Sequence, residues 1–94
     1  MKVVFGAPAA QELEEAIGWY ERRRAGLGAR FHAAVERTVQ ELSAHPQIGR
    51  ARHDAKQLPV PGFPYVLVYE VMPHSIVIAA VAHTRRRPKY WRAV

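Results

Sequence analysis

Apolar residues recur in the first half of the chain with the 3.6-residue period of an α-helix, in two separate stretches. The first opens at Pro8, which a first helical turn tolerates because its missing N–H would have no partner there. Gly26 and Gly28 interrupt the pattern, and the second stretch should end before Pro46, since the residue before a proline is pushed out of the helical region. Two helices joined by so short a loop should pack antiparallel. The inward-facing positions are Leu13, Ala16, Ile17 and Tyr20, then Leu27, Phe31, Ala34, Val35, Thr38, Val39 and Leu42.

The second half of the chain has the pattern of β-strands. Residues 65–72 and 75–83 are rich in Val, Ile and Tyr and are apolar at both alternating sets of positions, which is typical of central strands. The two residues between them leave room only for a tight connection, so the pair should form an antiparallel hairpin. A short run at residues 2–6 predicts a strand at the edge or start of a sheet, and residues 56–60 allow a further short strand.

This order predicts an α+β fold: an N-terminal strand, an antiparallel helical hairpin, then a C-terminal antiparallel sheet. The hairpin should cover one face of the sheet and leave the other face for function. A chain of 94 residues has the size of one domain with one modest core, so residues 1–94 are interpreted as a single domain. The residues expected in the core are Leu13, Ile17, Phe31, Val35, Leu42, Leu67 and Ile78.

Composition narrows the classes of partner and compartment. The formal net charge is +6 with histidine neutral, which favours nucleic acid, a membrane surface or an acidic protein segment as partner. The absence of cysteine excludes disulfides and thiolate metal sites and is compatible with a reducing cytosol. No signal peptide or membrane-spanning run is recognisable. We therefore expect a soluble, cytoplasmic domain.

The last predicted strand leads directly into a basic and aromatic segment. Its cations would neutralise phosphates, and Tyr90 and Trp91 would stack on unpaired bases, so the segment suits RNA or single-stranded DNA. It equally suits an acidic protein groove. Alternatively, the two aromatic rings fold back onto the sheet as an apolar lid and the cations are only solvated. The cations are Arg85, Arg86, Arg87, Lys89 and Arg92.

His83 is the main candidate for acid–base chemistry. It alternates with Val77, Ala79 and Val81, so it should extend their face of the sheet at the strand end, where an acid or base can work. The alternative is a structural, hydrogen-bonded histidine. No metal-ligand spacing, nucleophile elbow or glycine-rich phosphate loop is present, so neither a metal nor a cofactor is expected. A second basic cluster comprises Arg50, Arg52, His53 and Lys56.

Four segments, taken in order, resemble the RelE/ParE superfamily of toxins from type II toxin-antitoxin systems. They are "GAPAAQELEEAIGWYERRRAGLGARF", "HPQIGR", "FPYVLVYEV" and "VAHTRRRPKYW", which together cover nearly the whole chain. The resemblance implies a compact microbial-RNase-like α+β fold. It also implies a cognate antitoxin whose acidic, amphipathic segment wraps the toxin in a hetero-oligomer and blocks its active surface.

Two targets are known in this superfamily. RelE-like members cleave mRNA in the ribosome, whereas ParE-like members bind DNA gyrase and are not nucleases. RelE-like enzymes carry an arginine inside "GYRLVY" and lysines on the preceding strand. Here Val66 stands in place of that arginine, Val60 and Pro61 occupy the preceding segment, and Lys56 is the nearby substitute. We therefore favour the ParE-like branch, with gyrase or another replication protein as target.

The alternatives assign different roles to the basic residues. In a RelE-like, metal-independent endoribonuclease, the catalytic residues would be His83, Arg85, Arg87 and Tyr90. A third possibility is a non-toxic nucleic-acid-binding domain, which basic charge alone permits. In the favoured reading the residues expected to bind the target are Arg50, Arg52, Lys56, Arg86, Lys89, Trp91 and Arg92.

Overall fold

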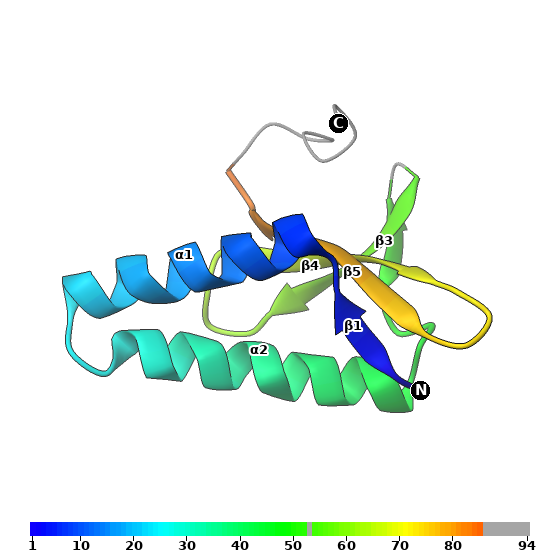
Figure 1. Ribbon diagram of the computed structural model, residues 1–94, viewed down its shortest axis with the longest axis horizontal. Coiled ribbons are helices and arrows are strands. Elements are labelled where there is room, and N and C mark those ends of the chain that lie inside the picture. The colour runs from blue at the N-terminus through cyan, green and yellow to red at the C-terminus, as the bar shows by residue number, and fades with distance from the viewer. Residues whose placement is uncertain (53, 86–94) are drawn as a thin grey trace.

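The computed structural model describes residues 1–52 and 54–85 and places two helices against one five-stranded sheet in that part of the chain (Figure 1). The order of elements confirms the predicted α+β fold, with one short strand, β2, that the sequence pattern did not predict. Neither helix of the described chain is long and apolar enough to cross a bilayer. The elements are β1 (Val3–Phe5), α1 (Ala7–Arg23), α2 (Leu27–Ala44), β2 (Arg50–Arg52), β3 (Ala55–Val60), β4 (Tyr65–Val71) and β5 (Ile76–His83).

The strands lie in the order β1-β5-β4-β3-β2. The strands β2 to β5 pair antiparallel with their sequence neighbours, as predicted for the C-terminal sheet. Strand β1 lies at the edge and pairs parallel with β5, with Val3 opposite Ile76 and Phe5 opposite Ile78. The complete sheet is therefore mixed, and its ends are the two short strands β1 and β2.

The helices form the predicted antiparallel hairpin on one face of the sheet (Figure 1). Gly26 supplies the left-handed turn between them, with φ +88°. Gly28, expected in the break, instead lies inside α2, and a Cβ there would stand 2.6 Å from the Ile17 carbonyl oxygen. Glycine at this position lets the two helices approach closely. Both N–H groups are satisfied by Glu21, whose carboxylate accepts from Gly26 at 2.9 Å and from Gly28 at 3.0 Å.

The hydrophobic core lies between the helical hairpin and the sheet. Five of the expected core residues are buried: Phe31, Val35, Leu42, Leu67 and Ile78. The other two, Leu13 and Ile17, are half-buried and pack against the edge of this core. The period of the apolar residues identified the correct face of α1. It does not show how much of that face the rest of the protein covers.

A β-bulge changes which face of the sheet His83 occupies. Val68 pairs with Ala80, but the next residue of β4, Tyr69, pairs with Ile78, so Ala79 is an extra residue in β5. Residues beyond the bulge therefore change face, and His83 lies on the helix-covered side with Ile78. The prediction that His83 shares a face with the strand residues 77 and 79 is wrong, because simple alternation does not anticipate an inserted residue.

A groove between the first helix and the end of the last strand

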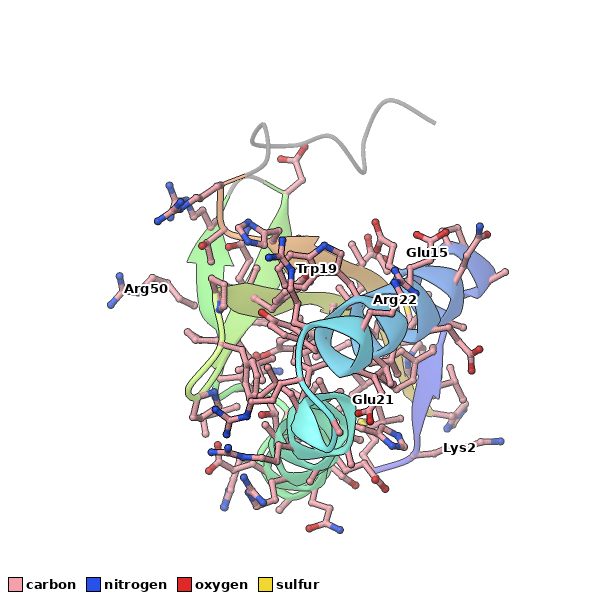
Figure 2. The ribbon with its side chains drawn as sticks, turned by 90° about the vertical axis from the view of Figure 1, so that its left-hand side faces the viewer. Lys2, Glu15, Trp19, Glu21, Arg22 and Arg50 are labelled. Atoms are coloured by element: carbon pink, nitrogen blue, oxygen red, sulfur yellow. The ribbon has the colours of Figure 1, made fainter. Side chains whose placement is uncertain are left out.

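The described chain has an open groove of about 690 Å³ between α1 and the adjoining end of the sheet. Figure 2 labels Glu15, Trp19 and Arg22 along the side of α1 that contributes to it. We call it the α1 groove. Its lining residues are Glu12, Glu15, Ala16, Trp19, Tyr20 and Arg22 from α1, with Pro64, Tyr65, Val81, His83 and Arg85 from the sheet end.

The helical period explains why α1 lines the groove along its length. Positions 12, 15, 16, 19 and 22 follow the three- and four-residue steps that place side chains on one side of a helix. Trp19 is 45% exposed, and its ring contacts two neighbouring side chains. The Arg23 guanidinium lies 4.2 Å from its ring centroid, and the Tyr20 ring meets it edge-on at 5.1 Å. The groove therefore displays an exposed tryptophan that packs against two neighbours.

Beneath the groove lies an aromatic cluster shared by the helices and the sheet. The rings of Tyr20, Phe31, Phe63 and Tyr65 contact one another with centroids 5.0 to 6.2 Å apart. Burial, and to a smaller extent the nearby Tyr65, raises the pKa of the Tyr20 hydroxyl above its usual value. Tyr20 therefore stays a neutral phenol at neutral pH, and the cluster gives the groove a rigid, uncharged floor.

His83 lies at the end of β5, half-buried at the rim of this cluster. Its ring meets the Tyr65 ring edge-on at 5.1 Å, and its Nδ1 accepts a hydrogen bond from the Arg85 N–H at 3.1 Å. A histidine that accepts through Nδ1 carries its proton on Nε2. The structure thus brings together two of the residues expected for catalysis, His83 and Arg85, and gives the histidine a structural contact as well.

Glu12 joins α1 to β5 next to the bulge. Its Oε1 accepts a hydrogen bond of 2.9 Å from the N–H of Val81, the second residue after Ala79. A carboxylate on a backbone N–H is a charge-assisted hydrogen bond, stronger than a neutral one. The contact holds the groove's two walls together.

The predicted basic cluster does not form one surface. Arg50 and Arg52 pair with Gln57 and Ala55, whereas Lys56 pairs with Ala51, so strand alternation puts Lys56 on the other face from the two arginines. All three β2 residues are exposed, and Arg50 points away from the molecule in Figure 2. None of the three cations lines the α1 groove. The remaining predicted residues lie outside the described residues: His53, Arg86, Arg87, Lys89, Tyr90, Trp91 and Arg92.

Sequence reasoning missed the α1 side of the groove. None of the predicted site residues lies in α1, yet Arg22 lines the groove and Arg23 stacks on Trp19. The signal in the sequence was Trp19 itself, a large aromatic residue beside the apolar stripe rather than within it. Tyr65 was correctly predicted to lie in a strand, but a local pattern cannot predict its contact with the Tyr20 ring from α1.

Comparisons with known proteins agree with this fold. The sequence model of a family described as the ParE toxin of the type II toxin-antitoxin system parDE matches residues 3–88. A solved chain of the chromosomal ParDE system from P. aeruginosa superimposes with a TM-score of 0.69 at 17% identity, covering 90% of this chain and 97% of that one. That likeness shows the fold. No curated protein is significantly similar in sequence. The family match, which spans nearly the whole chain, shows that this protein belongs to the ParE toxin family of type II toxin-antitoxin systems.

Proposed function

We propose that this ParE-family toxin acts in the cytoplasm by binding DNA gyrase or another replication protein through the α1 groove, and that a cognate antitoxin neutralises it by blocking that surface. The observation that carries the proposal is the exposed Trp19, which lines the α1 groove and packs against the Arg23 guanidinium. Tryptophan and arginine in such a setting are the residues that contribute most to protein–protein affinity.

The environment of Val66 supports binding over RNA cleavage. Val66 stands where RelE-like enzymes have an arginine, and it packs beside the buried cluster of Val68, Ala80 and Ala82 on the sheet face away from the helices. A nuclease of this type needs cations around the phosphorane that forms during cleavage. At this position β4 offers a hydrocarbon side chain instead.

A paired assay of the purified toxin tests the target. We expect inhibition of DNA supercoiling by gyrase and no cleavage of mRNA on translating ribosomes. Trp19→Ala should weaken the inhibition by roughly tenfold or more, since buried interface tryptophans commonly contribute 2 kcal/mol or above. Arg24→Ala, an exposed change outside the α1 groove, is the matched control. Inhibition that survives Trp19→Ala unchanged would remove the α1 groove from the target surface.

One observation favours the alternative ribonuclease: His83 and Arg85 line the same groove. A histidine base and a guanidinium beside a phosphate are two of the groups that metal-free RNA cleavage requires. In that case mRNA is cleaved in the ribosome assay, His83→Gln abolishes cleavage, and gyrase is unaffected. This result overturns the gyrase proposal.

Neutralisation is tested in cells. Co-expression of the cognate antitoxin should restore growth of a host that the toxin alone arrests. Harmless expression of the toxin alone would contradict the proposed function.

A further inference from the structure

Strand β5 has an open edge beside the α1 groove. Strand β1 pairs with residues 76–78 of β5, and the chain then turns into α1 (Figure 1). In the described part of the chain, residues 79–83 therefore have no strand on that side, and Val81 and His83 line the α1 groove there. An uncovered strand edge presents a row of peptide N–H and carbonyl groups, so this wall of the groove is made of backbone.

The pairing of β5 with β4 identifies the peptide groups that face this edge. The Thr84 N–H donates to the Pro64 carbonyl oxygen at 2.9 Å, so Thr84 directs its N–H toward β4. Peptide groups alternate between the two edges along an antiparallel strand, so those of Val81 and His83 point away from β4. The side chains of both residues lie on the helix-covered face, and both residues line the same groove as Trp19.

Glu12 already satisfies one of these peptide groups. Its Oε1 accepts from the Val81 N–H at 2.9 Å, which is the hydrogen bond that a carbonyl oxygen of a neighbouring strand would otherwise make. Within residues 1–52 and 54–85, the Val81 carbonyl oxygen and the N–H and carbonyl oxygen of His83 have no hydrogen-bond partner. Three successive backbone groups along the groove are therefore available to a ligand.

We propose that the α1 groove binds an extended segment of a protein partner, which adds a short strand to the open edge of β5. The identity of that partner as the toxin's target rests on the proposed function, whereas the binding itself rests on the backbone geometry of the edge. A partner helix fits this wall poorly. Its own peptide groups are already paired, so it would bury the three β5 groups without hydrogen-bond partners.

The alternation of side chains predicts the pattern of the added segment. Partner residues opposite Val81 and His83 would direct their side chains to the helix-covered face, where Trp19 and Tyr65 line the groove. Both rings offer apolar surface, so these two partner residues should be β-branched or aromatic. The partner residue between them would face away from the helices. The segment therefore carries apolar residues at i and i+2.

Two isomeric peptides test the strand pairing. Both have about seven residues in which Thr and Val alternate, the length of an ordinary strand. One peptide is N-methylated at its Val residues and the other at its Thr residues. N-methylation removes an N–H donor, and these donors alternate between the two edges of a strand, so only one isomer can pair with β5. We expect dissociation constants from NMR titration to differ by roughly tenfold or more, and the isomer that binds shows whether the added strand is antiparallel or parallel.

Variants of the toxin locate the binding. Trp19→Ala should weaken the binding isomer by roughly tenfold, because its ring lines the groove. The control Ile48→Ala removes another large apolar side chain of similar exposure, 43% against 45%, outside the α1 groove, and should bind as the parent chain does. Hydrogen exchange of the His83 amide should slow when the peptide binds, since this N–H gains an acceptor. Circular dichroism checks folding, and Trp19→Phe replaces Trp19→Ala if the latter does not fold.

Three results would overturn the proposal. The first is equal affinity of the two isomers, including no binding of either. The second is an equal effect of the Trp19 and Ile48 variants. The third is slow exchange of the His83 amide in the chain alone that becomes fast when residues 86–94 are deleted, because the chain would then cover its own edge. None of these results touches the proposed function, which is decided by growth arrest, gyrase inhibition and rescue by the antitoxin. Peptide pairing without gyrase inhibition would leave the strand site in place and remove gyrase as the target.

Discussion

At the scale of single residues, Tyr69 holds the turn that leads from α2 to β2. The ring is fully buried in the core, and its hydroxyl accepts from the Gly49 N–H at 2.8 Å while donating to the Pro46 carbonyl oxygen at 3.1 Å. Burial raises the pKa of this phenol, and the Gly49 N–H partly opposes the shift. The "HPQIGR" segment is therefore pinned to the sheet by one phenol, and its glycine is required for space as well as for turning.

Two glycine substitutions distinguish a glycine that close packing requires from a glycine that only lowers the stability of its helix. A Cβ on Gly49 would lie 2.3 Å from the Tyr69 hydroxyl, so Gly49→Ala must displace the buried ring and should lower the free energy of unfolding by about 1 to 3 kcal/mol. A Cβ on Gly18, inside α1, meets only the flexible end of Arg22. Gly18→Ala should raise the same quantity by about 0.5 to 1 kcal/mol.

Urea denaturation of the two variants measures both effects. Equal stability of Gly49→Ala and the parent chain would show that the turn is not pinned by Tyr69.

At the scale of elements, α1 performs three tasks on different sides. Its apolar face, with Ala9 and Ala16, packs on the sheet. The side that carries Trp19 lines the α1 groove. Its last turn supplies Glu21, whose two oxygens accept from the N–H groups at the start of α2. The N-cap residue of α2 is a glycine, which has no side chain that could accept these hydrogen bonds. Glu21 of the preceding helix therefore caps α2, and its negative charge faces the positive end of the α2 dipole.

Removal of this inter-helix cap should be measurable. Glu21→Ala leaves two N–H groups of α2 without their partner and should lower the free energy of unfolding by about 1 to 2 kcal/mol. Glu14→Ala makes the same change of residue at an exposed position of the same helix and should stay within about 0.5 kcal/mol of the parent. Thermal denaturation compares the two, and an equal effect of both variants would contradict the capping role.

At the scale of the whole molecule, one aromatic cluster supports two surfaces. Tyr20 and Tyr65 line the α1 groove, and Phe63, in contact with Tyr20, lines a second groove between α2 and the turn that joins β3 to β4. On the other side of the sheet, Val68, Ala80 and Ala82 form a smaller buried cluster with Val66 against it. The same packed rings therefore support both surfaces.

Two leucines that the helical period equally predicts to lie in the core test how far the core extends. Leu42→Ala empties a fully buried site and should lower the free energy of unfolding by about 2 to 5 kcal/mol. Leu13 is half-buried, so Leu13→Ala should cost less than half as much, because less apolar surface is exposed on unfolding. Chemical denaturation of both variants measures the two losses in the free energy of unfolding. Equal losses would mean that Leu13 on α1 is as fully covered as Leu42.

Much of the fold was predictable because the relevant signals are local. The period of apolar residues identified α1 and α2, Pro46 marked the end of α2, and runs of β-branched residues identified β4 and β5. The four family-like segments indicated the RelE/ParE superfamily, and Val66 in place of an arginine favoured its ParE-like branch, which the family match confirms. In the candidate site, His83 and Arg85 were both predicted from the sequence. They lie close together in any fold, because they are two residues apart at the end of one strand.

What the tertiary structure decided depends on pairing between distant segments. The extra residue Ala79 moved His83 to the helix-covered face, and the register of β2 against β3 separated Arg50 from Lys56. Trp19 became part of a groove because β5 ends beside α1. A local pattern records which residues prefer to be buried, but strand register and helix position are set by hydrogen bonds and packing among residues far apart in sequence. The sequence by itself therefore determined the family and every element except β2, and the tertiary structure alone decided which side chains meet in the grooves.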